Sequence, residues 1–197
     1  MKLKNPTGTK RIVIDNNDVT TRHGAPLQIT LEDFDRGSRE FNLEVILKGE
    51  NAHCEIQGRA TAQGEDKKIW NVKQVFEGKN QIGKIELRGT ASEKSFLQFD
   101  GTAELTHKSV DADAQVREKI ILFDEARGKL LPILTVKTDK VLGASHSASI
   151  APVSEDQLLY LQSRGISQKE AENVLREGFL KGIILGGPDF PHNLLSS

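Results

Sequence analysis

The sequence predicts a mainly β chain that ends in an α-helical hairpin, and three observations lead to this fold class. Between residues 11 and 140, short segments rich in β-branched and aromatic residues often alternate polar with apolar positions. Proline, which cannot donate to a strand ladder, is scarce in this region. From Ser154 onward the apolar residues recur with a period of about 3.6 instead of two, which is typical of the buried face of a helix.

The β region divides into eight expected strands, separated by Gly, Asn and Asp residues that favour turns. We expect a flexible N-terminus over 1–10, a β core over 11–150, a helical segment over 151–183 and a tail over 184–197. The expected strands are RIVID (11–15), FNLEVIL (41–47), HCEIQ (53–57), KIWNVKQVF (68–76), KIELRG (84–89), SFLQFDG (95–101), KIILF (119–123) and PILTVKT (132–138).

Two segments of the β region resemble each other, which favours a stacked architecture. EIQGRATA (55–62) and ELRGTASE (86–93) share an acidic, an aliphatic and a polar residue followed by Gly-x-Ala. In a solenoid each turn buries the face of its neighbour, so such a repeat is expected there. An ordinary β-sandwich with a chance similarity between two strands is the alternative at this point.

Two helices joined by a tight turn are expected after the β region. Ser154 and Gln157 have the spacing of a capping box, and Ser167 and Glu170 repeat it. Gly165 supplies the left-handed residue that ends the first helix after Arg164. The seam between two such short helices cannot form a core of its own, so the hairpin must dock on the β region or on a partner. The expected apolar residues are Leu158, Leu159 and Leu161 in the first helix and Ala171, Val174, Leu175, Gly178 and Phe179 in the second.

The composition excludes several classes of protein. The 197 residues carry a net charge of −1 with no block of like charge, so we expect no nucleic-acid partner. The single cysteine, Cys54, excludes an internal disulfide and favours a reducing compartment. The longest apolar runs are far too short to span a bilayer, so we expect a soluble, cytoplasmic protein that does not engage a membrane.

The common catalytic and metal-binding patterns are absent. The five histidines show no paired spacing with each other or with Cys54, which argues against a self-contained zinc or cluster site. GKNQIGK (78–84) lacks the spacing of a phosphate-binding loop, and GASHS (143–147) lacks the pattern of a nucleophile elbow. Cys54 lies in an alternating segment and fits a buried small hydrophobe. Asp111 and Asp113 could in principle form the carboxylate pair of a solenoid glycosidase, but a solvated turn is the simpler explanation.

The C-terminal segment GASHSASIAPVSEDQLLYLQSRGISQKEAENVLREGF (143–179) resembles the signature of the SufB/SufD family of iron–sulfur cluster assembly proteins. Upstream, FDG (99–101), DADAQ (111–115), IILFDEA (120–126) and Pro132 are similar to family elements in order and spacing. The resemblance covers roughly residues 40–180. The residues in register within the hairpin are Gln157, Leu158, Tyr160, Leu161, Ser163, Arg164, Gly165, Ile166, Ser167, Glu170, Ala171, Leu175, Gly178 and Phe179.

The resemblance implies a fold and a role. The family core is a right-handed parallel β-helix followed by helices, and its members resemble non-enzymatic scaffolds for cluster assembly. A SufC-type ABC ATPase docks on the helical region, which implies docking roles for Gln157, Tyr160, Arg164, Gly165, Glu170 and Phe179. His146 matches the histidine of the SufD branch near the interface between two scaffold subunits, where it is a candidate iron ligand for a transient cluster. No cofactor is expected to be bound stably.

The departures from the family pattern indicate a short, SufD-like chain. Residues 115–119 contain no thiol where the SufB branch has a cysteine, so a SufB-type partner would have to complete the site, and a homodimer is the other possibility. We expect His146 to lie where the β region passes into the hairpin. A hydrogen-bonded structural histidine is the alternative for that residue, and a β-helix interaction or structural module without metal chemistry is the alternative function.

Overall fold

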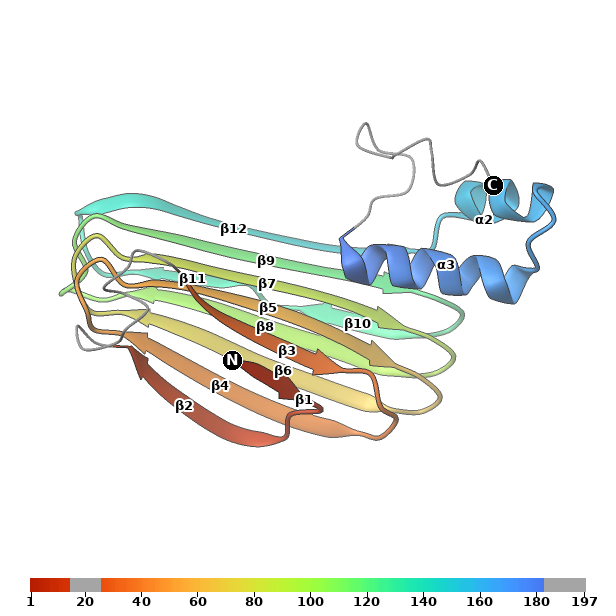
Figure 1. Ribbon diagram of the computed structural model, residues 1–197, viewed down its shortest axis with the longest axis horizontal. Helices are drawn as coiled ribbons and strands as arrows, with labels where there is room; N and C mark the ends of the chain where they lie inside the picture. The colour runs from red at the N-terminus through yellow and green to blue at the C-terminus, as the bar shows by residue number, and fades with distance from the viewer. Residues whose placement is uncertain (15–25, 183–197) are drawn as a thin grey trace.

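The computed structural model, which describes residues 1–14 and 26–182, is a β-solenoid of about five turns followed by two helices (Figure 1). Two sheets of parallel strands face each other, and each turn of the solenoid contributes one strand to each sheet. Sheet A has the order β1-β3-β5-β7-β9-β12, and sheet B has the order β2-β4-β6-β8-β10, with β11 also pairing with β8. This architecture confirms the parallel solenoid and excludes the sandwich, whose sheets would be antiparallel.

The strands of the two sheets alternate along the chain. Sheet A contains β1 (Lys2–Lys4), β3 (Leu27–Asp33), β5 (His53–Ala62), β7 (Ile82–Ala91), β9 (Ala112–Leu122) and β12 (Val141–Pro152). Sheet B contains β2 (Gly8–Ile14), β4 (Arg39–Leu47), β6 (Lys67–Phe76), β8 (Phe96–Leu105), β10 (Arg127–Leu130) and β11 (Ile133–Val136).

Both ends of the β region differ from the expectation. The first ten residues are not an irregular N-terminus, because β1 and the first three residues of β2 lie within them. Residues 141–150 lie within the expected β core but in none of the eight expected strands, and they belong to β12, which pairs with β9 from Val141 to Pro152. Small residues form a strand here because β9 supplies a complete hydrogen-bonding edge. Asp15 of the expected first strand and the expected tail over 184–197 lie outside the described residues.

The register between turns differs from the repeat seen in the sequence. The alignment of EIQGRATA with ELRGTASE would place Glu55 beside Glu86, but β5 pairs Glu55 with Lys84 and Gln57 with Glu86. The structural repeat at this point is therefore two residues shorter than the sequence repeat. A shift of two residues keeps every side chain on its original face of the sheet, so the pattern still predicted which residues are buried.

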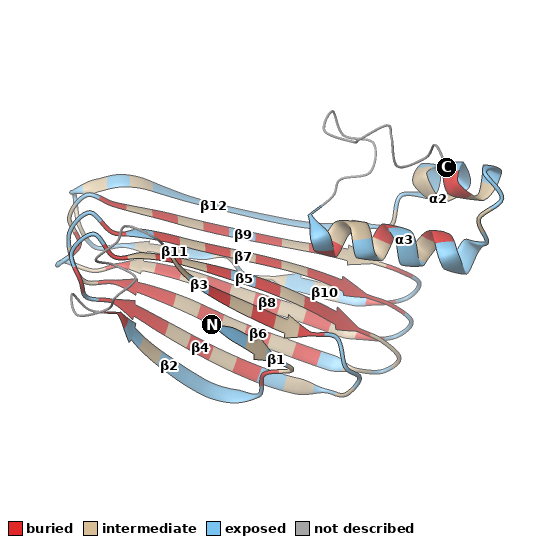
Figure 2. Cartoon of the chain, in the orientation of Figure 1, coloured by how far each residue is buried: buried red, intermediate tan, exposed pale blue. Residues whose placement is uncertain are grey.

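Apolar side chains fill the space between the sheets, and buried residues recur along the strands of both sheets (Figure 2). Trp70 of β6 is fully buried and contacts Phe41 edge-on, with ring centroids 6.4 Å apart, and Phe99, with centroids 5.5 Å apart. Gly58 lies opposite Trp70 on sheet A, and a Cβ atom at that position would approach the indole ring to 2.8 Å. At this point in the core, an aromatic ring of sheet B thus packs against a glycine of sheet A.

One corner has the same backbone conformation in successive turns of the solenoid, and an asparagine or aspartate occupies it each time. Asn51, Asn80 and Asp111 all adopt positive φ angles, between 52° and 58°, a region that Asn and Asp tolerate better than other side chains. Each donates its backbone N–H to a carbonyl of the next turn, on Lys79, Val110 and Lys140 respectively. Asp111 is therefore a corner residue of the solenoid, and the glycosidase alternative loses half of its proposed carboxylate pair.

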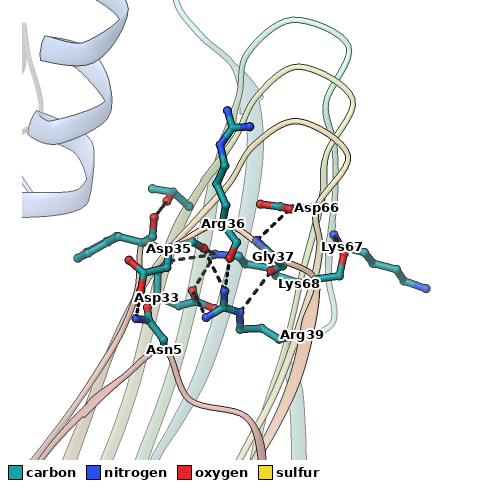
Figure 3. A network of polar contacts seen from close by, with 12 residues as sticks. Asn5, Asp33, Asp35, Arg36, Gly37, Arg39, Asp66, Lys67 and Lys68 are labelled. Carbon is teal, nitrogen blue, oxygen red and sulfur yellow. Dashed lines mark hydrogen bonds and ion pairs between the residues drawn. The ribbon is translucent and has the colours of Figure 1, made fainter.

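A cluster of buried polar side chains connects neighbouring turns at the opposite corner of the solenoid, near its N-terminal end (Figure 3). Lys68 is fully buried, and its Nζ donates to Asp33 Oδ1 at 2.7 Å and to the Asp35 carbonyl at 2.7 Å. Arg39 Nη1 lies 3.3 Å from the same Asp33 oxygen. Burial lowers the pKa of Lys68, while the hydrogen bond and charge of Asp33 oppose that shift. These contacts connect the end of β3 to β6 in the next turn. Removing one partner would leave a buried charge uncompensated, which is strongly destabilising.

The helical hairpin comprises α2 (Glu155–Ser163) and α3 (Gln168–Lys181). The Ser154 hydroxyl accepts from the Gln157 amide, and Ser167 and Glu170 form a reciprocal capping box, as the sequence predicts. Gly165 has the expected left-handed conformation, with φ of 85°. Leu161, Ala171 and Leu175 form the small core between the helices, whereas Leu159 and Val174, expected in the seam, are exposed. Among the described residues, neither helix is long and apolar enough to cross a membrane.

Candidate functional site

His146 lies in the middle of β12, the last strand of sheet A, and not at the junction with the hairpin as the sequence analysis expects. It pairs with Val116 of β9 in a parallel register, so both side chains lie on the inward face of the sheet. Val116 is buried because another turn covers it, whereas His146 is exposed because β12 is the last strand of its sheet. His146 therefore lies on the last turn, at the open end of the solenoid.

The imidazole ring is oriented by a backbone carbonyl. Nδ1 of His146 lies 3.3 Å from the carbonyl oxygen of Pro132, in the segment between β10 and β11. A carbonyl can only accept a hydrogen bond, so Nδ1 must carry the proton if this bond forms. The lone pair is then on Nε2, the atom available to a metal ion. A hydrogen bond from the second ring nitrogen to a carbonyl is the usual support of a metal-binding histidine.

The site contains too few ligands to bind a metal ion alone. The described residues contain no group of three or more His, Cys, Asp or Glu side chains arranged to hold one. Cys54 is buried in β5, three strands from β12 in sheet A, which at the usual strand spacing is about 14 Å away. Burial raises the pKa of its thiol to about 12, so it is protonated at neutral pH, and the expected role of a buried small hydrophobe is confirmed.

Glu118 is a buried acid near this end of the solenoid that the sequence analysis did not identify. It lies on β9, two residues beyond the strand partner of His146, and accepts a hydrogen bond from the Gly101 amide. Burial raises its pKa to about 8, with a smaller contribution from Asp100, so at neutral pH it is largely uncharged. The alternation of Val116, Glu118 and Ile120 on one face of the strand was the indication available in the sequence.

The strands around His146 leave the end of the solenoid uncovered. β12 has a neighbour only on its β9 side, and β10 and β11 pair only with β8 among the described residues. β12 is exposed over most of its length (Figure 2). The exposed aliphatic side chains of this end are Leu131, Ile133, Val136, Leu142 and Ile150. PILTVKT is thus an edge segment, as expected, and β12 forms a second and longer edge.

The hairpin residues expected to dock a partner do not form one surface. Tyr160 and Arg164 lie together on α2, with the guanidinium carbon 5.4 Å from the centre of the ring. Gln157 lies one turn earlier on α2, Gly165 forms the turn, and Glu170 is engaged in the cap of α3. Phe179 faces the solenoid instead, where the guanidinium of Arg88 lies over its ring at 6.0 Å. Exposed Leu159 and Val174 add apolar area to the outer surface of the hairpin.

Arginines attach α3 to the solenoid. Arg88 of β7 donates from Nη1 to the Phe179 carbonyl at 3.3 Å and is itself held by Glu86, whose Oε1 lies 2.6 Å from Nη2. Arg176 of α3 lies over the ring of Phe123 at 4.8 Å. Leu180 is buried at the end of the helix. The hairpin thus docks on the outer face of sheet A, as its short internal seam requires.

Comparison with known proteins agrees with this arrangement of solenoid and hairpin. The family model described as "SUF system FeS cluster assembly, SufBD core domain" matches residues 6–179, most of the chain. The chain belongs to the SufBD core-domain family. This membership confirms the resemblance seen in the sequence.

The SufBD relatives are longer than this chain. It is 30% identical to the iron–sulfur cluster assembly protein SufD of Bacillus subtilis over 139 residues, which cover 70% of the chain and 32% of SufD. It is 26% identical to SufB of the same organism over 145 residues, covering 74% of the chain and 28% of SufB. A chloroplastic SufBD family protein of Arabidopsis thaliana is 25% identical over 146 residues, covering 74% of the chain and 26% of that protein. The chain therefore spans about a third or less of the length of these relatives.

Proposed function

We propose that this chain is a non-enzymatic scaffold subunit in SUF-type iron–sulfur cluster assembly. A SufC-type ABC ATPase binds its hairpin, and a cysteine-bearing SufB-type subunit binds the open end of its solenoid. The family membership supports the pathway, because the relatives named above are cluster assembly proteins. The cluster is cargo, built at the interface between subunits and passed on, and is not a resident cofactor.

The position of His146 is the observation that carries this proposal. A histidine with Nδ1 near a carbonyl and Nε2 available is suited to bind iron, and it lies on a strand edge that another chain can approach. Clusters ordinarily take several thiolates, and Cys54 is too distant and too firmly protonated to supply one. Because the described residues hold no group of three or more such ligands, a partner supplies the remaining ones in this proposal, as in a scaffold of paired subunits.

The hairpin supports the assignment of the ATPase. Its outer surface presents Leu159, Tyr160 and Val174, which take no part in the core between the helices or in the contact with sheet A. Apolar side chains of this kind, beside Arg164, are typical of the centre of a protein interface. Because α3 is attached to β7, a partner on the hairpin is mechanically connected to sheet A.

The test is anaerobic co-expression of the chain with the ATPase and the cysteine-bearing scaffold, followed by size exclusion and visible absorption spectroscopy. We expect His146→Ala to leave the complex and the melting temperature unchanged and to lower cluster content about tenfold or more. His146→Asn, whose amide can still donate to the Pro132 carbonyl, should be equally deficient. His107→Ala, an exposed histidine in a turn, is the matched control.

Two other outcomes would contradict parts of the proposal. If His146→Ala lowers the melting temperature, His146→Asn restores it and cluster content is unaffected, then His146 is structural and the chain is a module without metal chemistry. If Leu159→Glu leaves co-purification of the ATPase unchanged, the ATPase does not bind this surface of the hairpin.

A further inference from the structure

A small cavity lies between the end of α3 and the outer face of sheet A. Its volume is about 160 Å³, and the charged residues around it are Arg59 of β5, Glu86 and Arg88 of β7, and Lys181 of α3. Leu180 and Gly182 close it on the side of the helix. The cavity is separate from His146, because β9 lies between β7 and β12 and because His146 is on the inward face of the sheet whereas the cavity is on its outer face.

The strand register aligns cations beside this cavity. Arg59 pairs with Arg88, and Arg88 pairs with Lys119, so three cationic side chains lie in one row across β5, β7 and β9. Like charges directly opposite on neighbouring strands destabilise a sheet. The row is therefore an arrangement that needs compensating negative charge.

Within the described residues, a carboxylate compensates the middle member of the row, Arg88. Arg88 is held by Glu86, with Nε at 3.0 Å and Nη2 at 2.6 Å from the same carboxylate oxygen. Burial acts to raise the pKa of Glu86, but the hydrogen bond and charge of Arg88, with Lys84 and Arg117, outweigh it and lower that pKa. Arg59 is partly buried, and its guanidinium has no hydrogen-bond or ion-pair partner within residues 1–14 and 26–182. One guanidinium beside the cavity is thus free to bind an anion.

The charge around the cavity matches a phosphate group. Three cations face one carboxylate, and that carboxylate is already engaged by Arg88. Within the described part of the chain, Lys181 is paired with exposed Glu177 of the same helix, at 3.0 Å, a contact weak enough to be exchanged for a better one. A phosphate carries a charge of about −1.5 to −2 at pH 7, and a free guanidinium can bind two of its oxygens at once.

We propose that this cavity binds a phosphate group, of inorganic phosphate or of a small organic phosphate, through Arg59 and Lys181. The site is independent of the proposed function, because it shares no residue with His146 or with the outer surface of the hairpin. It joins the solenoid to α3, since Arg59 belongs to β5 and Lys181 to the helix. A bound phosphate would therefore hold the hairpin against sheet A.

The test is calorimetric titration of the full chain with inorganic phosphate and, separately, with adenosine monophosphate, in chloride buffer of constant ionic strength. We expect saturable binding of one equivalent, weakened about tenfold or more in Arg59→Gln because a charge-assisted contact is lost. Arg59→Lys should bind with intermediate affinity, because a lysine cannot bind two oxygens through a planar fork. Lys119→Gln is the matched control: it removes the same charge from the same row but does not line the cavity.

Amide hydrogen exchange supplies a second measurement. Phosphate should slow exchange in α3 of the wild-type chain and of Lys119→Gln, but not of Arg59→Gln. Tighter binding of adenosine monophosphate than of inorganic phosphate would identify an organic phosphate as the ligand, and the reverse would identify the free ion. Absence of saturable binding, or equal weakening by Arg59→Gln and Lys119→Gln, would overturn the proposal, because general attraction to a basic face would then explain the data.

Discussion

Glu118 and His146 lie on the inward face of neighbouring strands, and their surroundings give them different chemistry. His146, on the last strand, is exposed and is oriented by a carbonyl, whereas Glu118, one strand earlier, is enclosed. An acid in this position accepts a backbone hydrogen bond in the core but must give up its charge to do so. An inward-facing residue is therefore exposed and available as a ligand on the edge strand β12, whereas on β9, one strand further in, it is buried and uncharged.

The raised pKa of Glu118 predicts an unusual dependence of stability on pH. The folded pKa, about 8, lies above the ordinary value of 4.5, so the folded state binds the proton more tightly than the unfolded state. This contribution to stability is fully present below about pH 4.5 and is lost as pH rises through about 8. Between these limits the free energy of unfolding should fall by about 1.4 kcal/mol per pH unit through this one group.

Urea unfolding at pH 5, 6, 7 and 8 measures this effect. Glu118→Gln, which cannot ionise, should have a flatter profile than the wild-type chain, with the difference between them growing steadily with pH. Glu86→Gln is the control. The pKa of Glu86 is lowered in the folded state, so removing this acid should not reduce the loss of stability between pH 5 and pH 8. Parallel profiles for the wild-type chain and Glu118→Gln would show that Glu118 ionises without penalty in the folded state.

At the scale of elements, the hairpin depends on local signals more than the strands do. Both of its caps and its turn follow from residues within four positions of each other, and Gly165 is the most constrained, with φ of 85°. Gly165→Ala should destabilise the hairpin by about 1 kcal/mol, because a side chain at a left-handed position is strained. Gly165→Asn should cost less, since Asn tolerates this conformation.

Amide exchange in α2 and α3 is the suitable measurement for Gly165, because the hairpin can open without unfolding the solenoid. Lys169→Ala, at an exposed position of α3, is the matched control. Equal exchange in Gly165→Ala and the wild-type chain would mean that the turn does not limit the stability of the hairpin.

The elements also show what a sequence can reveal. Strands rich in β-branched and aromatic residues, such as β4, β6 and β8, follow from pattern alone. β3 carries a similar pattern at Ile29 and Leu31, but it was not among the expected strands. β12 could not be predicted in this way, because its small residues form a strand only when β9 is beside them. The register of β5 on β7 likewise did not follow from the sequence repeat, because Glu55 pairs with Lys84 and not with Glu86.

The sequence indicated a residue for the candidate site but not the geometry around it. The family resemblance identified His146, but its contact with Pro132 joins β12 to the segment between β10 and β11, across the end of the solenoid. The bond from Arg88 to the Phe179 carbonyl links positions 91 residues apart, so nothing local indicates it. Glu118 was overlooked because a single acid in an alternating strand looks like an outward residue until its neighbours are placed.

At the scale of the whole molecule, the solenoid has two open ends that are not equally protected. At the N-terminal end, β2 (GTKRIVI) carries a lysine and an arginine, residues that discourage pairing with another chain. At the other end, β12 (VLGASHSASIAP) is longer, is exposed, and contains no Lys, Arg, Asp or Glu. An uncharged strand edge of this length is the expected place for a partner chain to add a strand.

The difference between the two ends predicts which one pairs with the cysteine-bearing scaffold. Ile150→Lys should abolish the association, because it places a charge on the β12 edge at a side chain that is 42% exposed. Val13→Lys makes the same change at a side chain of β2 that is 49% exposed, and should leave the association intact. Light scattering on each variant alone and in an equimolar mixture with the scaffold distinguishes the two ends, with circular dichroism confirming that both variants fold. If Val13→Lys disrupts the complex and Ile150→Lys does not, the subunits pair at the N-terminal end, His146 lies far from the partner, and a shared site at that residue is ruled out.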